Sequence, residues 1–243
     1  MSDVFFWILI ICANTLGETA GDLISQTFNI GYGYSTLLLM SMFTIVLVVY
    51  LFTDYLKSLL YWVIVALAST AGTTISDYFT RTYFRDELHF TEHQGYWYGS
   101  LILAALLALT FFFWKFISQK IKNNKNKTGE ILFWVAILCS SSLGTAVGDV
   151  LAHNTPLGFE GASFTLAICL VLIVFLAFTT HIPSKILFWG GIIFTHPIGA
   201  TIGDFLTKPE GLNLGNTRSS IILIVVLGLV VTLKIKFHKP IKQ

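Results

Sequence analysis

The sequence predicts an all-α polytopic membrane protein with eight transmembrane helices, and three observations lead to this fold class. Of its 243 residues, 55% are hydrophobic and only 12% are charged, whereas soluble domains carry about 25% charged residues. The mean hydropathy is +0.75. Eight apolar runs of roughly 20 residues recur along the chain, each long enough to cross about 30 Å of hydrocarbon as a helix. One motif is also repeated four times.

The four copies of the motif begin at tryptophans, Trp7, Trp62, Trp134 and Trp189. Each copy then has two small residues four positions apart, directly followed by an aspartate, in the segments GETAGD, GTTISD, GTAVGD and GATIGD. Small residues at this spacing let helices approach closely in lipid. We therefore expect four motif helices at the centre and four return helices outside them, with central packing through Gly17, Gly21, Gly72, Gly144, Gly148, Gly199 and Gly203.

The copies lie at offsets of 55, 72 and 55 residues, so the chain is a duplicated pair of duplicates. Each repeat is expected to be a helical hairpin, and all four motif helices then run parallel. The halves are residues 1–117 and 131–243, joined by a lysine-rich linker at 118–130, and a charged loop is expected at 81–93. The expected spans are about 4–24, 34–53, 58–80, 96–117, 131–152, 162–180, 185–207 and 217–237.

Most lysines lie on one side of this eight-span topology, in the linker, at the C-terminus, and at Lys57 and Lys185. The positive-inside rule places both termini and the linker in the cytoplasm. We interpret the lysines as a topology signal in contact with the lipid bilayer, and no nucleic-acid partner is expected. The sequence does not predict an oligomeric state.

The positions seven, eleven and fifteen residues after each tryptophan lie on one helical face, and they are polar except for Ala200 in the fourth copy. In the first copy they are Asn14, Glu18 and Asp22, and the fourth copy contributes His196. An ionisable group this deep in a membrane costs about 2.5–3.5 kcal/mol or more unless it is paired or hydrated, so it is a functional candidate. The residues expected to line a pore or its outer mouth are Asp77, Asp149, Asp204, Thr73, Thr145 and His153.

Three of the motif aspartates are followed, one helical turn later, by a basic residue: Arg81, His153 or Lys208. This order favours an ion pair within the helix. The first copy has the neutral Gln26 at that position and a second acid, Glu18, one turn before its aspartate. Two close carboxylates are not both ionised cheaply without a proton or a metal ion between them.

The fourfold motif, with its GETAGD-type segments, resembles a bacterial family of integral membrane proteins. That family is built from four copies of a two-helix repeat of unknown function, and its members are described as uncharacterised membrane-anchored proteins. The resemblance covers essentially the whole chain. It implies an eight-helix protein of the bacterial inner (plasma) membrane, and it implies no activity.

From the residues we expect a transporter or channel for a cation, with a divalent metal of the manganese, iron or zinc class as cargo. Glu18 and Asp22 would form the metal site, assisted by Asn14 and His196 once ring closure makes copies one and four neighbours. Protonation of the carboxylates would couple transport to protons. The alternatives are a membrane-embedded metal-binding protein or metalloenzyme, a carrier of a small organic cation, and a structural protein whose acids are merely paired. Neither haem nor a nucleotide is expected.

Overall fold

The computed structural model describes residues 4–54, 56–120 and 127–237, and these residues form eight long helices and no β-strand. All eight are long and apolar enough to cross a membrane, which confirms the predicted all-α fold with eight spans. The helices are α1 (Val4–Asp22), α2 (Tyr32–Phe52), α3 (Lys57–Asp77), α4 (Glu92–Lys120), α5 (Lys127–His153), α6 (Gly158–Thr179), α7 (Ser184–Thr207) and α8 (Asn216–Phe237).

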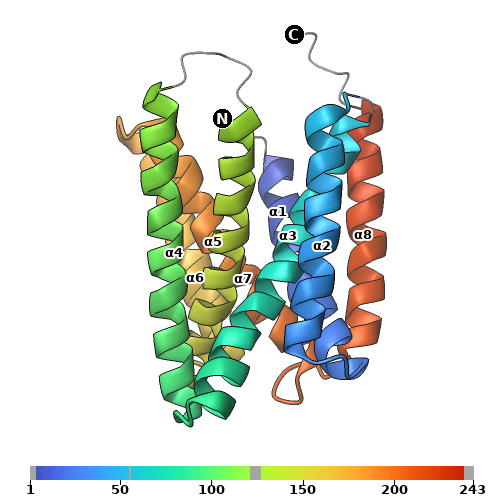
Figure 1. The fold of residues 1–243 in the computed structure, drawn as a ribbon, viewed down its shortest axis with the longest axis vertical. Helices are drawn as coiled ribbons and strands as arrows, with labels where there is room; N and C mark the ends of the chain where they lie inside the picture. Colours follow the sequence, from blue (N-terminus) through green and yellow to red (C-terminus); the bar gives the residue numbers. More distant parts are fainter. Residues whose placement is uncertain (1–3, 55, 121–126, 238–243) are drawn as a thin grey trace.

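The four motif helices α1, α3, α5 and α7 pack around one axis, which we call the ring. Each contacts two neighbours, so that α1 lies between α7 and α3, and α5 lies between α3 and α7. The return helices pack mainly across repeats, with α2 against α3, α4 against α5, α6 against α7 and α8 against α1. Figure 1 shows that α1 begins and α8 ends at the same end of the bundle.

Glycines set the spacing at all four seams of the ring, where a seam is the contact between two neighbouring motif helices. The residue seven positions after each tryptophan packs against a glycine of the neighbouring motif helix that comes before it in the ring. A Cβ atom on that glycine would overlap this residue, so only glycine allows the close contact. Apolar burial gives little drive for association in lipid, so this close packing holds the helices together. The pairs are Gly17 with Ser69, Gly72 with Ser141, Gly144 with His196 and Gly199 with Asn14.

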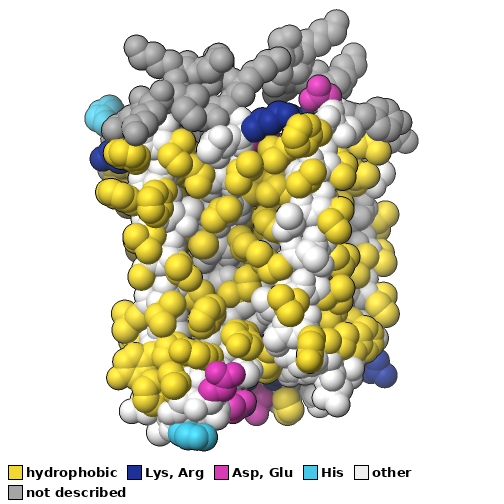
Figure 2. All heavy atoms as spheres, viewed as in Figure 1, with side chains coloured by type: hydrophobic (Ala, Val, Ile, Leu, Met, Phe, Trp, Pro, Cys, Tyr) yellow, Lys and Arg dark blue, Asp and Glu magenta, His cyan; other side chains and the backbone are white. Residues whose placement is uncertain are grey.

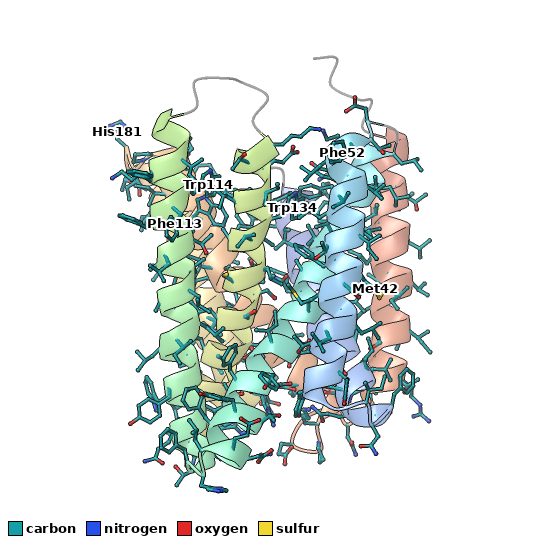
Figure 3. The ribbon with its side chains drawn as sticks, in the orientation of Figure 1. Met42, Phe52, Phe113, Trp114, Trp134 and His181 are labelled. Atoms are coloured by element: carbon teal, nitrogen blue, oxygen red, sulfur yellow. The ribbon has the colours of Figure 1, made fainter. Side chains whose placement is uncertain are left out.

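Aromatic side chains fill the end of the ring where the motif helices begin, which we call the tryptophan end. The aromatic residue before each motif tryptophan contacts the tryptophan of the next motif helix, and such pairs add about 0.5–1.5 kcal/mol beyond their burial. Figure 3 shows Trp134 and Trp114 near this end. The ring-centroid distances are 6.0 Å for Phe6–Trp62, 5.2 Å for Tyr61–Trp134, 5.7 Å for Phe133–Trp189 and 6.1 Å for Phe188–Trp7.

The flank of the bundle is apolar. Hydrophobic side chains cover the middle of the face in Figure 2, and charged side chains gather at its two ends. The exposed side chains of the return helices are mostly apolar, as at Met42 and Phe113. More than half of each motif helix's apolar window is buried, against less than a third in each return helix. This difference matches a polar core surrounded by a lipid-facing shell.

Two expectations about the connections need correction. The predicted loop at 81–93 is mostly helical, because α1 and α3 continue past their aspartates as π-helices, η1 (Leu23–Thr27) and η2 (Tyr78–Glu87). The expected linker at 118–130 is helical at both ends, since α4 runs to Lys120 and α5 begins at Lys127. Its central part, 121–126, lies outside the described residues.

Candidate cation site

Glu18 reaches the centre of the ring. Its Oε2 accepts a 3.0 Å hydrogen bond from Thr73 Oγ1 on the adjacent helix α3. It accepts another, also 3.0 Å, from Thr145 Oγ1 on α5, which is the opposite helix. A carboxylate that bonds both an adjacent and an opposite helix lies close to the ring axis. Glu18 is 4% exposed, and no salt bridge reaches it from the described residues.

The four motif aspartates form the next layer, at what we call the aspartate end, where two cations bridge them in pairs. Arg81 Nε donates to Asp77 Oδ1 at 3.0 Å, and its Nη2 lies 3.5 Å from Asp149 Oδ1. Lys208 Nζ bonds Asp22 Oδ2 and lies 3.5 Å from Asp204 Oδ1. Each cation thus joins its own helix to a neighbour, Arg81 across the α3–α5 seam and Lys208 across the α7–α1 seam.

The local pairs expected from the sequence are present, and Asp22 gains partners that the sequence did not indicate. Gln26, on η1, donates to Asp22, in addition to Lys208 from α7. His153 Nε2 lies 3.8 Å from Asp149 Oδ1. Asp22 therefore has a cation beside it after all, whereas Glu18 is held by hydroxyl groups alone.

The buried charges of these two layers do not balance. Five carboxylates, those of Glu18 and the four motif aspartates, are each at most 4% exposed. Among the residues that the structure describes, two permanent cations, Arg81 and Lys208, lie against them. If all five carboxylates were ionised, the cluster would carry three excess negative charges. Removing unpaired charge from water costs several kcal/mol per ion, so the cluster favours uptake of protons or cations.

Lys208 remains charged in this surrounding. It follows the last residue of α7, and burial alone lowers the pKa of its ammonium group. The carboxylates of Asp204 and Asp22 outweigh burial and raise this pKa well above the usual range of a lysine. This shift of the pKa favours the charged form of Lys208 at physiological pH.

Three carboxylates come close enough to share one ion, and we call them the carboxylate triad. Glu18, Asp22 and Asp204 each have an oxygen within 4.8 Å of the other two, and all three residues are buried. A calcium-sized ion holds its oxygen ligands at about 2.3–2.6 Å, so oxygens on opposite sides of it are up to about 5 Å apart. The spacing of the triad fits a single bound cation.

His196 does not join the triad, contrary to the expectation from ring closure. Its Nδ1 donates to the backbone oxygen of Ile192 at 2.9 Å and lies 3.3 Å from Ser140 Oγ. This places the imidazole one layer closer to the tryptophan end, against Gly144 of α5. The side chain that α7 brings to Glu18 and Asp22 is Asp204, which had been expected only at the outer mouth.

Several buried polar atoms have no hydrogen-bond partner within the described structure. Both Asn14 Oδ1 and Asn14 Nδ2 are unpartnered, although the residue is only 3% exposed. Asp77 Oδ2 and Asp149 Oδ2 are unpartnered in the aspartate layer. Buried polar atoms are rarely left without a partner, so such atoms mark positions for water or an ion. The unpartnered atoms of Asn14 lie one layer before Glu18, and those of Asp77 and Asp149 lie one layer after it.

An open pocket of about 440 Å³ lies beside the triad at the aspartate end. Two of its lining residues, Gln26 and Lys208, are the side chains that bond Asp22. These two side chains therefore stand between the pocket and Asp22. The rest of the pocket lining comes from Thr27, Thr207, Leu214, Gly215, Asn216, Thr217 and Arg218.

Two features of the site escaped the sequence analysis, although a signal for each is present in the sequence. An aromatic residue precedes every motif tryptophan, in FW, YW, FW and FW, and this repeated pair predicts the aromatic layer. Ring closure makes copies one and four neighbours, which equally predicts that Lys208 lies near Asp22.

The eight helices are long and apolar enough to cross a membrane and enclose a buried polar axis, which are features of the class of helical integral membrane proteins. The sequence of this chain matches the model of one family four times, at residues 5–55, 60–120, 132–182 and 187–239. The chain belongs to this family, the Repeat of Unknown Function (DUF347). Comparison with curated proteins finds no match, and neither does comparison with solved structures.

Proposed function

We propose that this protein is a transporter or channel that moves a divalent metal cation through the ring of motif helices. The carboxylate triad carries the proposal, because three buried acids share a space sized for one ion while the surrounding cluster has too few cations. The polar layer at Asn14 supports a path that continues from Glu18 toward the tryptophan end. Exchange of protons on the carboxylates is the natural coupling reaction, since an empty cluster would otherwise hold excess charge.

The ligand set favours a hard cation. All three triad ligands are carboxylate oxygens, and His196 turns its Nδ1 to its own helix. Carboxylate, carbonyl and water ligands suit magnesium, calcium and manganese, whereas imidazole and thiolate suit zinc and iron. Among the manganese, iron and zinc class we therefore favour manganese as the cargo.

The lysine distribution supports an orientation with both termini in the cytoplasm, in which every motif helix runs outward from its tryptophan. The aspartate end, with its pocket, then faces the outside. The resemblance of the motif to bacterial integral membrane proteins supports the inner membrane of a bacterium as the location.

Uptake of Mn²⁺ into proteoliposomes tests the proposal. We expect the wild-type protein to carry Mn²⁺ above the level of empty liposomes. Glu18→Gln and Asp22→Asn should reduce uptake to that background, because each removes one of the three charges that bind the ion. Asp54→Asn is the matched control, since Asp54 is a fully exposed acid that pairs with Lys57 among the described residues, and it should leave uptake unchanged.

The outcomes separate the alternatives. Metal that co-purifies in a Glu18-dependent manner but never crosses the liposome membrane would identify a metal-binding protein or metalloenzyme. Wild-type fluxes of Mn²⁺, Fe²⁺, Zn²⁺ and protons that all equal those of empty liposomes, with no bound metal by elemental analysis, would refute a role in cation handling. The acids would then be structural.

A further inference from the structure

Lys208 takes part in two features of the structure at once. Its ammonium group donates a hydrogen bond to Asp22 and forms an ion pair with Asp204, and these are two of the three acids of the triad. The same side chain lines the open pocket at the aspartate end. A cation that comes from the pocket and binds the triad therefore meets Lys208 first, and needs two carboxylates that Lys208 already pairs with.

We propose that Lys208 is an internal counter-cation, which an incoming divalent ion displaces from Asp22 and Asp204, and that this exchange selects divalent over monovalent cations. The proposal rests on the proposed function, because it concerns the same carboxylates. In this proposal Lys208 both controls the access of cations to the triad and discriminates between ions of different charge.

The two cations of the aspartate layer are not equally free to move. Arg81 lies within the helical segment η2, and its guanidinium sits over the Tyr96 ring, 5.5 Å from the ring centre. Its planar group donates a hydrogen bond to Asp77, forms an ion pair with Asp149 and stacks on an aromatic face, as arginine does at fixed positions. Lys208 follows the end of α7, has an extended backbone conformation, and carries a compact charge on a flexible stem. We infer that Arg81 is the fixed bridge and Lys208 the movable one.

Charge explains the selectivity. A monovalent ion that replaces the Lys208 ammonium leaves the charge of the triad as it was, and so gains little for the work of displacing a bonded group. A divalent ion adds one positive charge to a cluster that has an excess of carboxylates. The lysine thereby weakens binding of all cations, but it discriminates most strongly against those of single charge.

Binding of Mn²⁺ to the purified protein in detergent tests the exchange, with the loss of the electron paramagnetic resonance signal of free Mn²⁺ as readout. Lys208→Met keeps the length of the side chain and removes its charge. We expect this variant to bind Mn²⁺ about tenfold more tightly or better, because buried charge pairs couple at least this strongly. Added Na⁺ should compete with Mn²⁺ in the variant and not in the wild type.

Arg218→Gln is the matched control. Arg218 lines the same pocket, but it bonds neither Asp22 nor Asp204 in the described structure. Its removal takes the same charge from the pocket and should change Mn²⁺ affinity by less than about twofold, since exposed charges are screened by salt.

A second measurement needs no variant at Lys208. In the wild type, Mn²⁺ should increase the labelling of Lys208 by an amine-reactive reagent, measured by peptide mass spectrometry, because displacement frees its ammonium group. The labelling of Lys57, an exposed lysine at the other end of the bundle, should stay constant. This measurement decides the question if Lys208→Met fails to fold.

Unchanged or weaker Mn²⁺ binding by Lys208→Met, with Glu18-dependent binding by the wild type, would overturn the exchange and leave the proposed function standing. Constant labelling of Lys208 upon Mn²⁺ binding would overturn it as well. If neither protein binds Mn²⁺, the proposed function fails and the exchange fails with it. Binding by Lys208→Met alone would show that Mn²⁺ does not displace the lysine, and would overturn the exchange.

Discussion

Replacing Gly199 with alanine tests how closely α7 approaches α1, the contact that closes the ring. A Cβ atom at Gly199 would lie 2.8 Å from the backbone carbonyl carbon of Asn14 and 2.9 Å from the backbone nitrogen of Thr15. Backbone atoms cannot rotate away as the end of a side chain does, so the two helices must separate. Overpacking of this kind costs about 1–3 kcal/mol.

Gly228 provides the matched control on the outer helix α8. A Cβ atom there meets nothing within 4 Å. Alanine at this position removes only the flexibility of a glycine in a helix, which stabilises by about 0.5–1 kcal/mol. The same substitution should therefore change stability in opposite directions at the two positions.

Thermal unfolding of the purified protein in detergent measures both effects. A change of 1 kcal/mol shifts Tm by about 2–4 °C in a chain of this size, so Gly199→Ala should lower Tm by about 2–12 °C. Gly228→Ala should leave Tm equal to that of the wild type or higher. If Gly199→Ala unfolds at or above the Tm of Gly228→Ala, α1 and α7 are not in this contact, and the carboxylate triad that spans their seam is wrong.

Two further predictions use the same unfolding assay. Arg81→Met leaves Asp77 and Asp149 buried without their bridging cation and should destabilise the protein by about 3–5 kcal/mol. Adding Asp77→Asn should recover part of this loss, and a double variant no more stable than Arg81→Met would argue against the bridge. Trp134→Ala empties a position that is 1% exposed and should cost about 3–5 kcal/mol, far more than Phe113→Ala on the exposed flank. Equal losses at the two positions would contradict the aromatic layer.

The sequence predicted those parts of the fold that depend on local spacing. Eight apolar runs predicted eight helices because length and composition alone decide whether a helix can cross a membrane. The pairing of Asp77 with Arg81 was predictable, since residues four apart on a helix are always neighbours. The helical continuation η2 was missed because its charged residues, such as Arg85 and Asp86, have the composition of a loop.

Contacts across the seams were less predictable, because they depend on how neighbouring helices are rotated and offset along the axis. Glu18 lies on the predicted polar face, but only the ring geometry shows that Thr145, on the opposite helix, bonds it. His196 lies on that face too, yet its imidazole bonds the carbonyl of Ile192 on its own helix instead of reaching the triad. A helical pattern gives the direction of a residue and leaves the rotamer of its side chain open.

The fourfold repeat has to break its symmetry at the centre of the ring, and this explains why a single copy carries a glutamate, Glu18, at the ring axis. The position of Glu18 is occupied by Thr73, Thr145 and Ala200 in the other copies. Four carboxylates converging on one axis would repel one another with no room for cations between them, whereas a single one is satisfied by two threonine hydroxyl groups. The aspartate layer tolerates four acids because Arg81 and Lys208 lie between them. Of those two cations, only the lysine both borders the pocket and bonds two acids of the triad. The glutamate that breaks the fourfold symmetry thus lies beside the two aspartates from which we propose that a cation displaces Lys208.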